Sequence, residues 1–158
     1  MITHLTEGQK APAFTGKDQQ GKKISLSQFK GKNVVLYFYP QDATPTCTVQ
    51  ACNLRDHYTE LARAGFVVIG VSPDESSSHE KFASKQNLPF LLIADTDHRL
   101  IEKYGVWGEK QLYGRKYMGL HRTTFLIDGK GIIRKIFHKP KSKEHSEEIL
   151  KAWNELQK

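Results

Sequence analysis

Cysteine is scarce in this chain, which has two cysteines among its 158 residues. A framework of several disulfides is therefore excluded, and two cysteines in a reducing compartment are more typical of a catalytic or metal-binding role than of a structural one. No apolar run approaches the ~20 residues of a membrane-spanning helix. The N-terminal segment lacks a basic head followed by an apolar block. We therefore expect no secretory signal, no membrane association and a cytoplasmic location.

The composition is otherwise that of an ordinary globular protein, with 38% hydrophobic and 26% charged residues. The length suits one domain, and no repeat or long linker divides the chain, so we expect a single domain over residues 1–158. The formal net charge is +7. The basic residues are spread out, with denser patches only at 139–143 and around Arg122, and no nucleic-acid-binding motif accompanies them. We interpret them as a solvated basic surface rather than a nucleic-acid site.

The most informative stretch is a strand that leads into a loop and then a helix. Residues 34–39 form a continuous β-branched and aromatic run, which is typical of a strand buried on both faces. Pro40 and Pro45 prevent further strand pairing. Apolar residues then recur at spacings of four and three from Cys47 to Leu61, as on one face of a helix. This pattern places Cys47 in the first helical turn, at the positive end of the helix dipole.

Cys47 has two interpretations at this point. A helix N-terminus or a nearby cation favours the thiolate form of cysteine, which is the reactive form. On this interpretation the sulfur is both ionised and accessible. Alternatively, Cys47 is a small hydrophobic residue on the core face of its helix, because free cysteine is often buried.

Cys52 favours redox chemistry over a structural role. Five residues along an ideal helix correspond to a rise of ~7.5 Å and a rotation of about 140°, which would place the two Cα atoms roughly 8–9 Å apart. A disulfide needs Cα atoms within ~7 Å of each other. Cys47 and Cys52 can therefore exist as two thiols in an intact helix, whereas a bond between them requires the first turn to unwind. The spacing favours a switchable redox pair.

These residues resemble a known family. Pro40, Thr44 and Cys47 match the Pro-x-x-x-Thr-x-x-Cys pattern of the peroxiredoxins. The spacing of Cys47 and Cys52 is similar to that of the bacterioferritin comigratory protein branch, also called peroxiredoxin Q. The resemblance implies a thioredoxin-like α/β fold, with a central mixed sheet flanked by helices and an N-terminal extension. It covers most of the chain, and Arg122, just before Thr-Thr-Phe-Leu-Ile-Asp, matches the active-site arginine of the family.

The resemblance also implies an activity and a role for each site residue. Cys47 would be the peroxidatic cysteine of a thiol-dependent peroxidase that reduces hydrogen peroxide and organic hydroperoxides through a sulfenic acid. Cys52 would resolve that sulfenic acid as an intramolecular disulfide, and a thioredoxin-type dithiol would reduce the disulfide. The family further implies no cofactor, no metal and a monomeric protein.

Other residues of the motif would support this chemistry. Arg122 would hold the thiolate and polarise the peroxide. Thr44 would offer its hydroxyl to the peroxide or the sulfur, and Pro40 would shield the sulfur. Thr46 stands where this branch commonly has glycine, and we expect a β-branched residue there to stiffen the loop.

Hydrophobic patterns and turn residues predict the other elements. Residues 105–120 are rich in glycine and aromatic residues, and we expect a loop there, which the resemblance places beside the active site. The other expected elements are, in order, a turn at 18–21 between extended pieces, a short helical turn at 25–29, a strand at 66–72 joined by a crossover, a helix at 76–86, a strand at 89–93, a helix at 95–104 capped by Asp95 or Thr96, a hairpin of 123–128 with 132–137, and an amphipathic helix at 144–157.

Three alternatives remain open. A thioredoxin-like disulfide oxidoreductase shares the strand, loop and helix, but it normally carries Cys-x-x-Cys, and position 50 is glutamine. A zinc site from Cys47, Cys52 and His57 would be a binding function, although these spacings do not match the usual zinc-finger patterns. A redox sensor that passes its disulfide to a regulatory partner would use the same chemistry. Turnover with a thioredoxin system would separate a sensor from a peroxidase.

Overall fold

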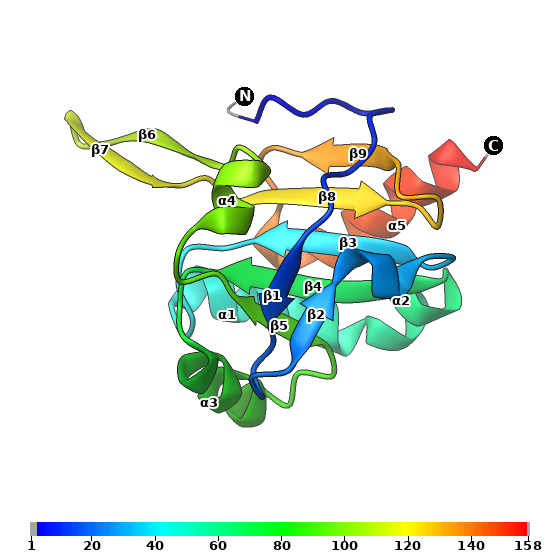
Figure 1. Cartoon of the computed structure of the whole chain (residues 1–158), viewed down its shortest axis with the longest axis horizontal. Helices are drawn as coiled ribbons and strands as arrows, with labels where there is room; N and C mark the ends of the chain where they lie inside the picture. Colours follow the sequence, from blue (N-terminus) through cyan, green and yellow to red (C-terminus); the bar gives the residue numbers. More distant parts are fainter. Residues whose placement is uncertain (1–2, 158) are drawn as a thin grey trace.

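The centre of the molecule is a seven-stranded mixed sheet with the strand order β2-β1-β5-β4-β3-β8-β9 (Figure 1). The computed structural model describes residues 3–157; the first two residues of the N-terminal segment, where we expect no signal sequence, lie outside this range. Strands β3, β4 and β5 are parallel, whereas β8 and β9 and the β1–β2 hairpin pair antiparallel at the two sides. The strands are β1 (Thr15–Lys17), β2 (Lys23–Ser25), β3 (Asn33–Phe38), β4 (Phe66–Ser72), β5 (Leu91–Ala94), β8 (Thr123–Ile127) and β9 (Ile133–Phe137).

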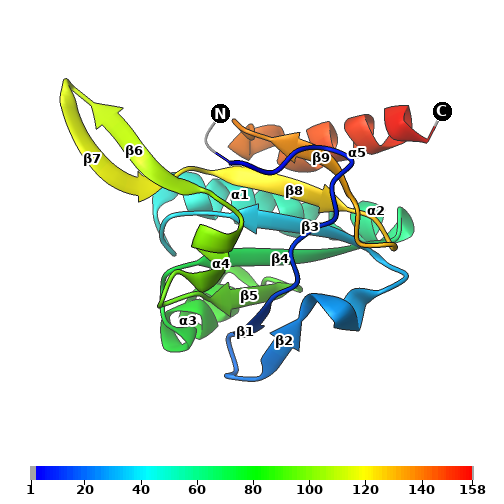
Figure 2. The same cartoon turned by 45° about the horizontal axis from the view of Figure 1, so that its top comes forward.

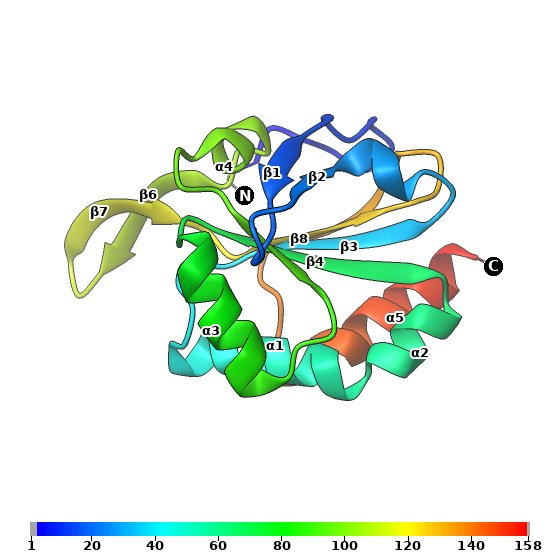
Figure 3. The same cartoon turned by 60° about the horizontal axis from the view of Figure 1, so that its bottom comes forward.

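Helices cover both faces of this sheet. Four of them lie on one face, and the short helix α4 lies on the other (Figure 3). The central mixed sheet flanked by helices agrees with the fold class that the sequence predicts. The helices are α1 (Pro45–Asp56), α2 (Tyr58–Arg63), α3 (Ser76–Gln86), α4 (Arg99–Lys103) and α5 (His145–Leu156), together with the 3₁₀ turns η1 (Leu26–Phe29) and η2 (Ser142–Glu144).

Strand β3 is buried on both faces, as its sequence predicts. Successive side chains of a strand point to opposite faces of the sheet. Val34 and Leu36 therefore join the core cluster on the α4 side, whereas Val35 and Tyr37 join the cluster beneath the other four helices. A strand packed from both sides is a rigid base for the loop and helix that follow it.

The helix predicted from Cys47 to Leu61 is two helices in the structure. Helix α1 ends at Asp56, and His57 has φ −109° and ψ 17°, outside the helical range, before α2 begins. The apolar spacing does not reveal this break, because Leu54 and Leu61 on either side of it pack into the same core cluster.

Helix α4 is shorter than the predicted helix at 95–104. The sequence predicts Asp95 or Thr96 as its N-cap, but the N-cap residue is His98, in the left-handed conformation with φ 61°. The carboxylate of Asp95 still accepts hydrogen bonds from the first helical turn, from the N–H groups of Leu100 at 3.1 Å and Ile101 at 2.8 Å. Asp95 therefore caps the helix from farther back in the chain than a normal N-cap residue.

Residues 105–120 form a β-hairpin rather than the predicted loop. Strands β6 (Trp107–Leu112) and β7 (Arg115–Leu120) pair with each other in a separate two-stranded sheet, which projects away from the body of the molecule (Figures 1 and 2). Tyr113 and Gly114 at its tip both have positive φ, as the tight turn of a hairpin requires. The sequence does not predict this turn, because Tyr113 takes the position before Gly114 where such turns usually have asparagine or aspartate.

Candidate active site

Cys47 lies in the first turn of α1, directly after the loop that leaves β3, as the sequence predicts. Pro45 takes the first helical position, where its missing N–H is not needed. The N-cap residue is Thr44, and its side chain makes no capping hydrogen bond. The N–H groups of Thr46 and Cys47 belong to the first turn, where no intrahelical carbonyl can reach them. The positive end of α1 is therefore open beside the sulfur.

Arg122 lies against this sulfur. Its Nη2 donates to Cys47 Sγ at 2.9 Å, and its Nη1 donates to Gln50 Oε1 at 3.2 Å. Arg122 and Cys47 are 75 positions apart in the sequence, and the antiparallel pairing of β8 with β3 brings them together. A guanidinium in this position stabilises a thiolate by its charge and by its donated hydrogen bond.

The sulfur is less accessible than the sequence leads us to expect. Cys47 exposes 1% of its surface and packs in the core cluster beneath α1. The reason is helical geometry, because position 47 faces inward together with Ala51 and Leu54. The expectation of an accessible sulfur is therefore wrong: the residue is on the core face of its helix, and a half-buried cation, Arg122, contacts it there.

Thr44 and Pro40 lie in the loop, where their contacts are local. The hydroxyl of Thr44 donates to the carbonyl oxygen of Gln41 at 3.2 Å rather than to the sulfur of Cys47. Pro40 is half-buried at the start of the loop. Rotation of the Thr44 side chain would be needed to bring its hydroxyl to a substrate.

Cys52 lies later in the same helix, and both cysteines are free thiols, as an intact helix requires. Cys52 is half-buried, and its Sγ donates to Gln86 Oε1 at 3.4 Å. Arg55 donates to the carbonyl oxygen of Gln86 at 2.7 Å. These contacts connect the middle of α1 to the C-terminal end of α3.

Asn53, next to Cys52, fixes α1 to the start of α5. Its Nδ2 donates to the carbonyl oxygen of Lys143 at 2.9 Å, and its Oδ1 accepts from the N–H of Ser146 at 2.8 Å. Both partners are backbone groups at the junction of η2 and α5, so the side-chain amide of Asn53 supplies a hydrogen-bond partner to each of them simultaneously. We therefore expect any unwinding that precedes disulfide formation to be confined to the first turn of α1.

Sequence reasoning missed two buried polar side chains of this site. Gln50 Nε2 and Tyr37 Oη are buried, and neither has a hydrogen-bond partner among residues 3–157. Burial raises the pKa of Tyr37 well above its usual value, and the electrostatic influence of the neighbouring Cys47 and Asp42 raises it further, so the phenol stays protonated. Gln50 could have been found from its position, three residues after Cys47 on the apolar face of the helix.

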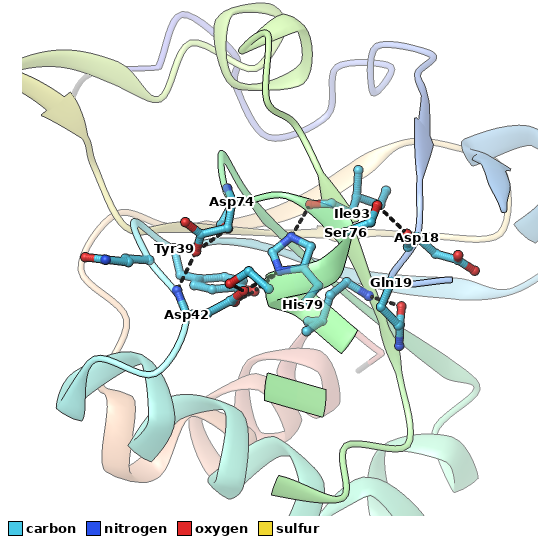
Figure 4. A network of polar contacts seen from close by, with 12 residues as sticks. Asp18, Gln19, Tyr39, Asp42, Asp74, Ser76, His79 and Ile93 are labelled. Atoms are coloured by element: carbon cyan, nitrogen blue, oxygen red, sulfur yellow. Dashed lines mark hydrogen bonds and ion pairs between the residues drawn. The ribbon is translucent and has the colours of Figure 1, made fainter. Parts of the chain in front are cut away.

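A buried polar cluster anchors the loop that leads to Cys47 (Figure 4). The carboxylate of Asp42 accepts from Tyr39 Oη at 2.6 Å and from Ser78 Oγ at 2.8 Å, and it lies 2.7 Å from His79 Nδ1. The other ring nitrogen, Nε2, lies 2.9 Å from the carbonyl oxygen of Ile93. Sequence reasoning missed this cluster too, because Asp42 and His79 are 37 positions apart and belong to no motif.

The contacts of His79 indicate a buried ion pair. Both ring nitrogens face acceptors, the carboxylate of Asp42 and the carbonyl of Ile93, so each nitrogen needs its own N–H and the ring is positively charged. Burial raises the pKa of Asp42, but the hydrogen bonds from His79 and Tyr39 and the charge of His79 more than offset burial, and the pKa lies below its usual value. The Asp42–His79 pair is therefore a carboxylate–imidazolium pair inside the protein.

This pair has a consequence for stability against pH. Because the folded-state pKa of Asp42 is lowered, its carboxylate stabilises the folded protein above its unfolded-state pKa of ~3.9, and this contribution is lost as the pH falls through the folded-state value. We expect Asp42→Asn to lower the free energy of unfolding by about 2 kcal/mol at neutral pH, and by clearly less at about pH 3. Urea unfolding at the two pH values measures this.

The control for this prediction is Asp56→Asn, because Asp56 is an exposed carboxylate at the C-terminal end of α1, far along the chain from the loop that holds Asp42. We expect its effect to stay within ~0.5 kcal/mol at both pH values. A deficit of equal size at both pH values for Asp42→Asn would show that the charge of Asp42 does not contribute.

The structure gives the zinc alternative no support. Within residues 3–157, no group of three histidine, cysteine, aspartate or glutamate side chains is placed to hold a metal ion, so Cys47, Cys52 and His57 do not form a site. In the same part of the chain, no helix combines the length and the apolar character needed to cross a membrane.

The structure thus places one thiol in the first turn of α1 within reach of a guanidinium, and a second thiol farther along the same helix. The Cys-x-x-Cys alternative fails, because Gln50 stands at the second position. The chain belongs to the AhpC/TSA family, whose profile matches residues 7–136, and within it to the peroxiredoxins of the bacterioferritin comigratory protein, or Q, type.

Curated relatives and solved structures support this assignment. Peroxiredoxin Bcp of Bacillus subtilis is 47% identical over 149 residues, which cover 94% of this chain and 95% of that protein. Peroxiredoxin Bcp of Escherichia coli is 45% identical over 146 residues, covering 92% of this chain and 94% of that protein.

Among solved structures, a cysteine-to-serine mutant of Xylella fastidiosa PrxQ has a TM-score of 0.91 at 28% identity and 99% coverage of both chains. The bacterioferritin comigratory protein of Xanthomonas campestris has a TM-score of 0.85 at 32% identity and 92% coverage of both chains. The thioredoxin-like fold and the peroxiredoxin class that the sequence predicts are thus confirmed.

Proposed function

We propose that Cys47 is the peroxidatic residue of this peroxiredoxin. Its thiolate attacks one oxygen of the hydroperoxide, so that an S–O bond forms as the O–O bond breaks. The other oxygen leaves with a proton as water or an alcohol, and Cys47 becomes a sulfenic acid. The observation that supports this proposal most strongly is the 2.9 Å contact from Arg122 Nη2 to Cys47 Sγ.

Donors around the sulfur would stabilise the charge that develops on the peroxide oxygens. Arg122 carries a permanent positive charge, and the N–H groups of Thr46 and Cys47 are free of intrahelical partners. In this proposal the hydroxyl of Thr44 rotates away from the carbonyl of Gln41 to bind the peroxide, and Pro40 limits the access of water to the sulfur. The substrate has to displace part of the cover over Cys47, which exposes 1% of its surface.

Cys52 would then resolve the sulfenic acid. Its thiolate attacks the sulfur of Cys47, so that an S–S bond forms, the S–O bond breaks, and hydroxide leaves as water after taking up a proton. This step needs the first turn of α1 to unwind, because the Cα atoms of an intact helix would be roughly 8–9 Å apart at this spacing.

A thioredoxin-type dithiol would return the enzyme to its reduced state by giving two electrons to the disulfide. In this proposal the enzyme acts as a monomer in the cytoplasm. The solved X. campestris relative is described as having alkyl peroxide reduction activity, which supports organic hydroperoxides as substrates beside hydrogen peroxide. Sustained peroxide consumption with a thioredoxin system would distinguish this enzyme from a redox sensor.

A thiol count after one equivalent of hydrogen peroxide tests the roles of the two cysteines. We expect the wild-type protein to lose both thiols, because one oxidising equivalent ends as the disulfide of Cys47 and Cys52. In Cys52→Ser we expect a sulfenic acid at Cys47 that dimedone traps and mass spectrometry locates. If Cys47 stays unmodified in both proteins, the assignment is wrong.

A further inference from the structure

The loop between β3 and α1 is anchored next to the reactive cysteine. Asp42 stands five positions before Cys47. Its side chain is held by the Asp42–His79 pair, and its backbone N–H donates to Asp74 Oδ2 at 2.6 Å (Figure 4). His79 in turn contacts the carbonyl oxygen of Ile93. Through these contacts the loop is attached to α3, to the segment after β4 and to β5.

The segment between this anchor and the helix start is strained. Ala43 has φ 61°, in the left-handed region that residues other than glycine rarely adopt. Such a conformation persists only where the flanking residues hold it. Asp42 is held by its buried contacts on one side, and on the other side the carbonyl oxygen of Thr44 accepts from the N–H of Thr48 at 2.9 Å. Release of either side lets Ala43 relax.

We propose that the Asp42–His79 pair positions the first turn of α1 for peroxide attack and restrains the unwinding that brings Cys47 to Cys52. The inference rests on the proposed function, because it assigns the pair a role in the two successive steps at Cys47. Neither Asp42 nor His79 contacts Cys47, so both are positioning residues that act through the loop.

Two opposite effects follow from this role. Attack on peroxide requires the folded first turn of α1, in which Arg122 contacts the sulfur of Cys47, whereas disulfide formation requires this turn to be unwound. Weakening the anchor shifts the population from the first conformation towards the second. While the folded turn remains the major state, its population falls little, but the minor unwound population rises in proportion to the change in the equilibrium constant.

The experiment measures both steps in a single turnover of Asp42→Asn, which keeps the shape of the side chain and removes its charge. Reduced protein is mixed with one equivalent of hydrogen peroxide, quenched rapidly with a thiol-alkylating reagent and analysed by mass spectrometry. We expect conversion of the sulfenic acid into the disulfide to become about tenfold faster, while oxidation of Cys47 slows by less than about twofold because the folded turn remains the major state. Ser78→Ala removes one hydrogen bond to the carboxylate, and should make disulfide formation about twofold faster with almost no change in the oxidation of Cys47.

The matched control is Asp128→Asn. Asp128 is a half-buried carboxylate that, like the buried Asp42, is held by several polar contacts. It accepts from the N–H groups of Lys130 and Ile132 and pairs with Arg134, but it follows β8 at the end of the sheet remote from Cys47. We expect this variant to lose stability while both rates stay within about 1.5-fold of wild type. General destabilisation is thereby separated from a change in the loop.

The two rates distinguish the possible failures. Unchanged disulfide formation in Asp42→Asn and Ser78→Ala, or a proportional slowing of both steps, overturns the positioning role but leaves the peroxidase intact. Ser78→Ala keeps the inference falsifiable if Asp42→Asn does not fold. A wild-type Cys47 that peroxide does not oxidise overturns the proposed function itself, and the positioning role with it.

Discussion

Replacing Cys47 by serine is expected to reduce peroxide turnover by at least about 10⁴-fold, because it removes the only group that the proposal uses as the nucleophile. A serine hydroxyl stays protonated at neutral pH, and the guanidinium of Arg122 cannot ionise it. Serine differs from cysteine by one atom, so the position should remain packed between Ala51 and the sheet. Peroxide consumption in the presence of a thioredoxin system measures the loss, and circular dichroism checks the fold.

The control for this substitution is Cys52→Ser, which removes the other sulfur of the same helix. It should oxidise once at the wild-type rate and then stop, so the two variants separate attack from resolution. Residual turnover of Cys47→Ser above a few per cent of wild type would mean that another residue attacks the peroxide.

Replacing Arg122 by alanine is expected to lower the second-order rate of Cys47 oxidation by about 10²-fold. Loss of one donor to a developing negative charge has this order of effect in other active sites. In this protein the change also leaves Gln50 Oε1 and Cys47 Sγ without the donor that they share. Stopped-flow oxidation by a limiting amount of hydrogen peroxide measures the rate directly, without the reductant.

Arg122→Lys is the informative companion of this variant. Lysine keeps the positive charge, but its single ammonium lacks the planar fork that contacts Gln50 and Cys47 together. We expect an intermediate loss of about tenfold. If the alanine variant oxidises as fast as wild type, the contact between Arg122 and the sulfur serves only packing.

The helix start could be predicted from the sequence, because its signals are local. Pro45 and the apolar spacing after it place Cys47 in the first turn, and the spacing to Cys52 excludes a disulfide in an intact helix. Arg122 is different. The residues around it predict only the entrance to a strand, and its place beside Cys47 depends on the pairing of β8 with β3. Only the resemblance to the peroxiredoxins indicated it before the structure.

The features that the sequence did not predict depend on tertiary contacts. The charge of Asp42 has no visible partner in the sequence, because His79 reaches it from another helix. Gln50 looks like any polar helical residue until the helix packs on the sheet. The β6–β7 hairpin was missed for a local reason, since Tyr113 takes a positive φ without the side-chain hydrogen bond that helps asparagine or aspartate to do so.

The two backbone contacts of Asn53 hold the second half of α1 against the start of α5. Cys52 belongs to that half, so in the proposed cycle the sulfur of Cys47 moves towards Cys52, while the sulfur of Cys52 keeps its position. Rearrangement upstream of residue 52 does not need to propagate into α5 or across the sheet. Oxidation and reduction would then alternate within one short segment, while the outline of the molecule and its far surface keep the same shape.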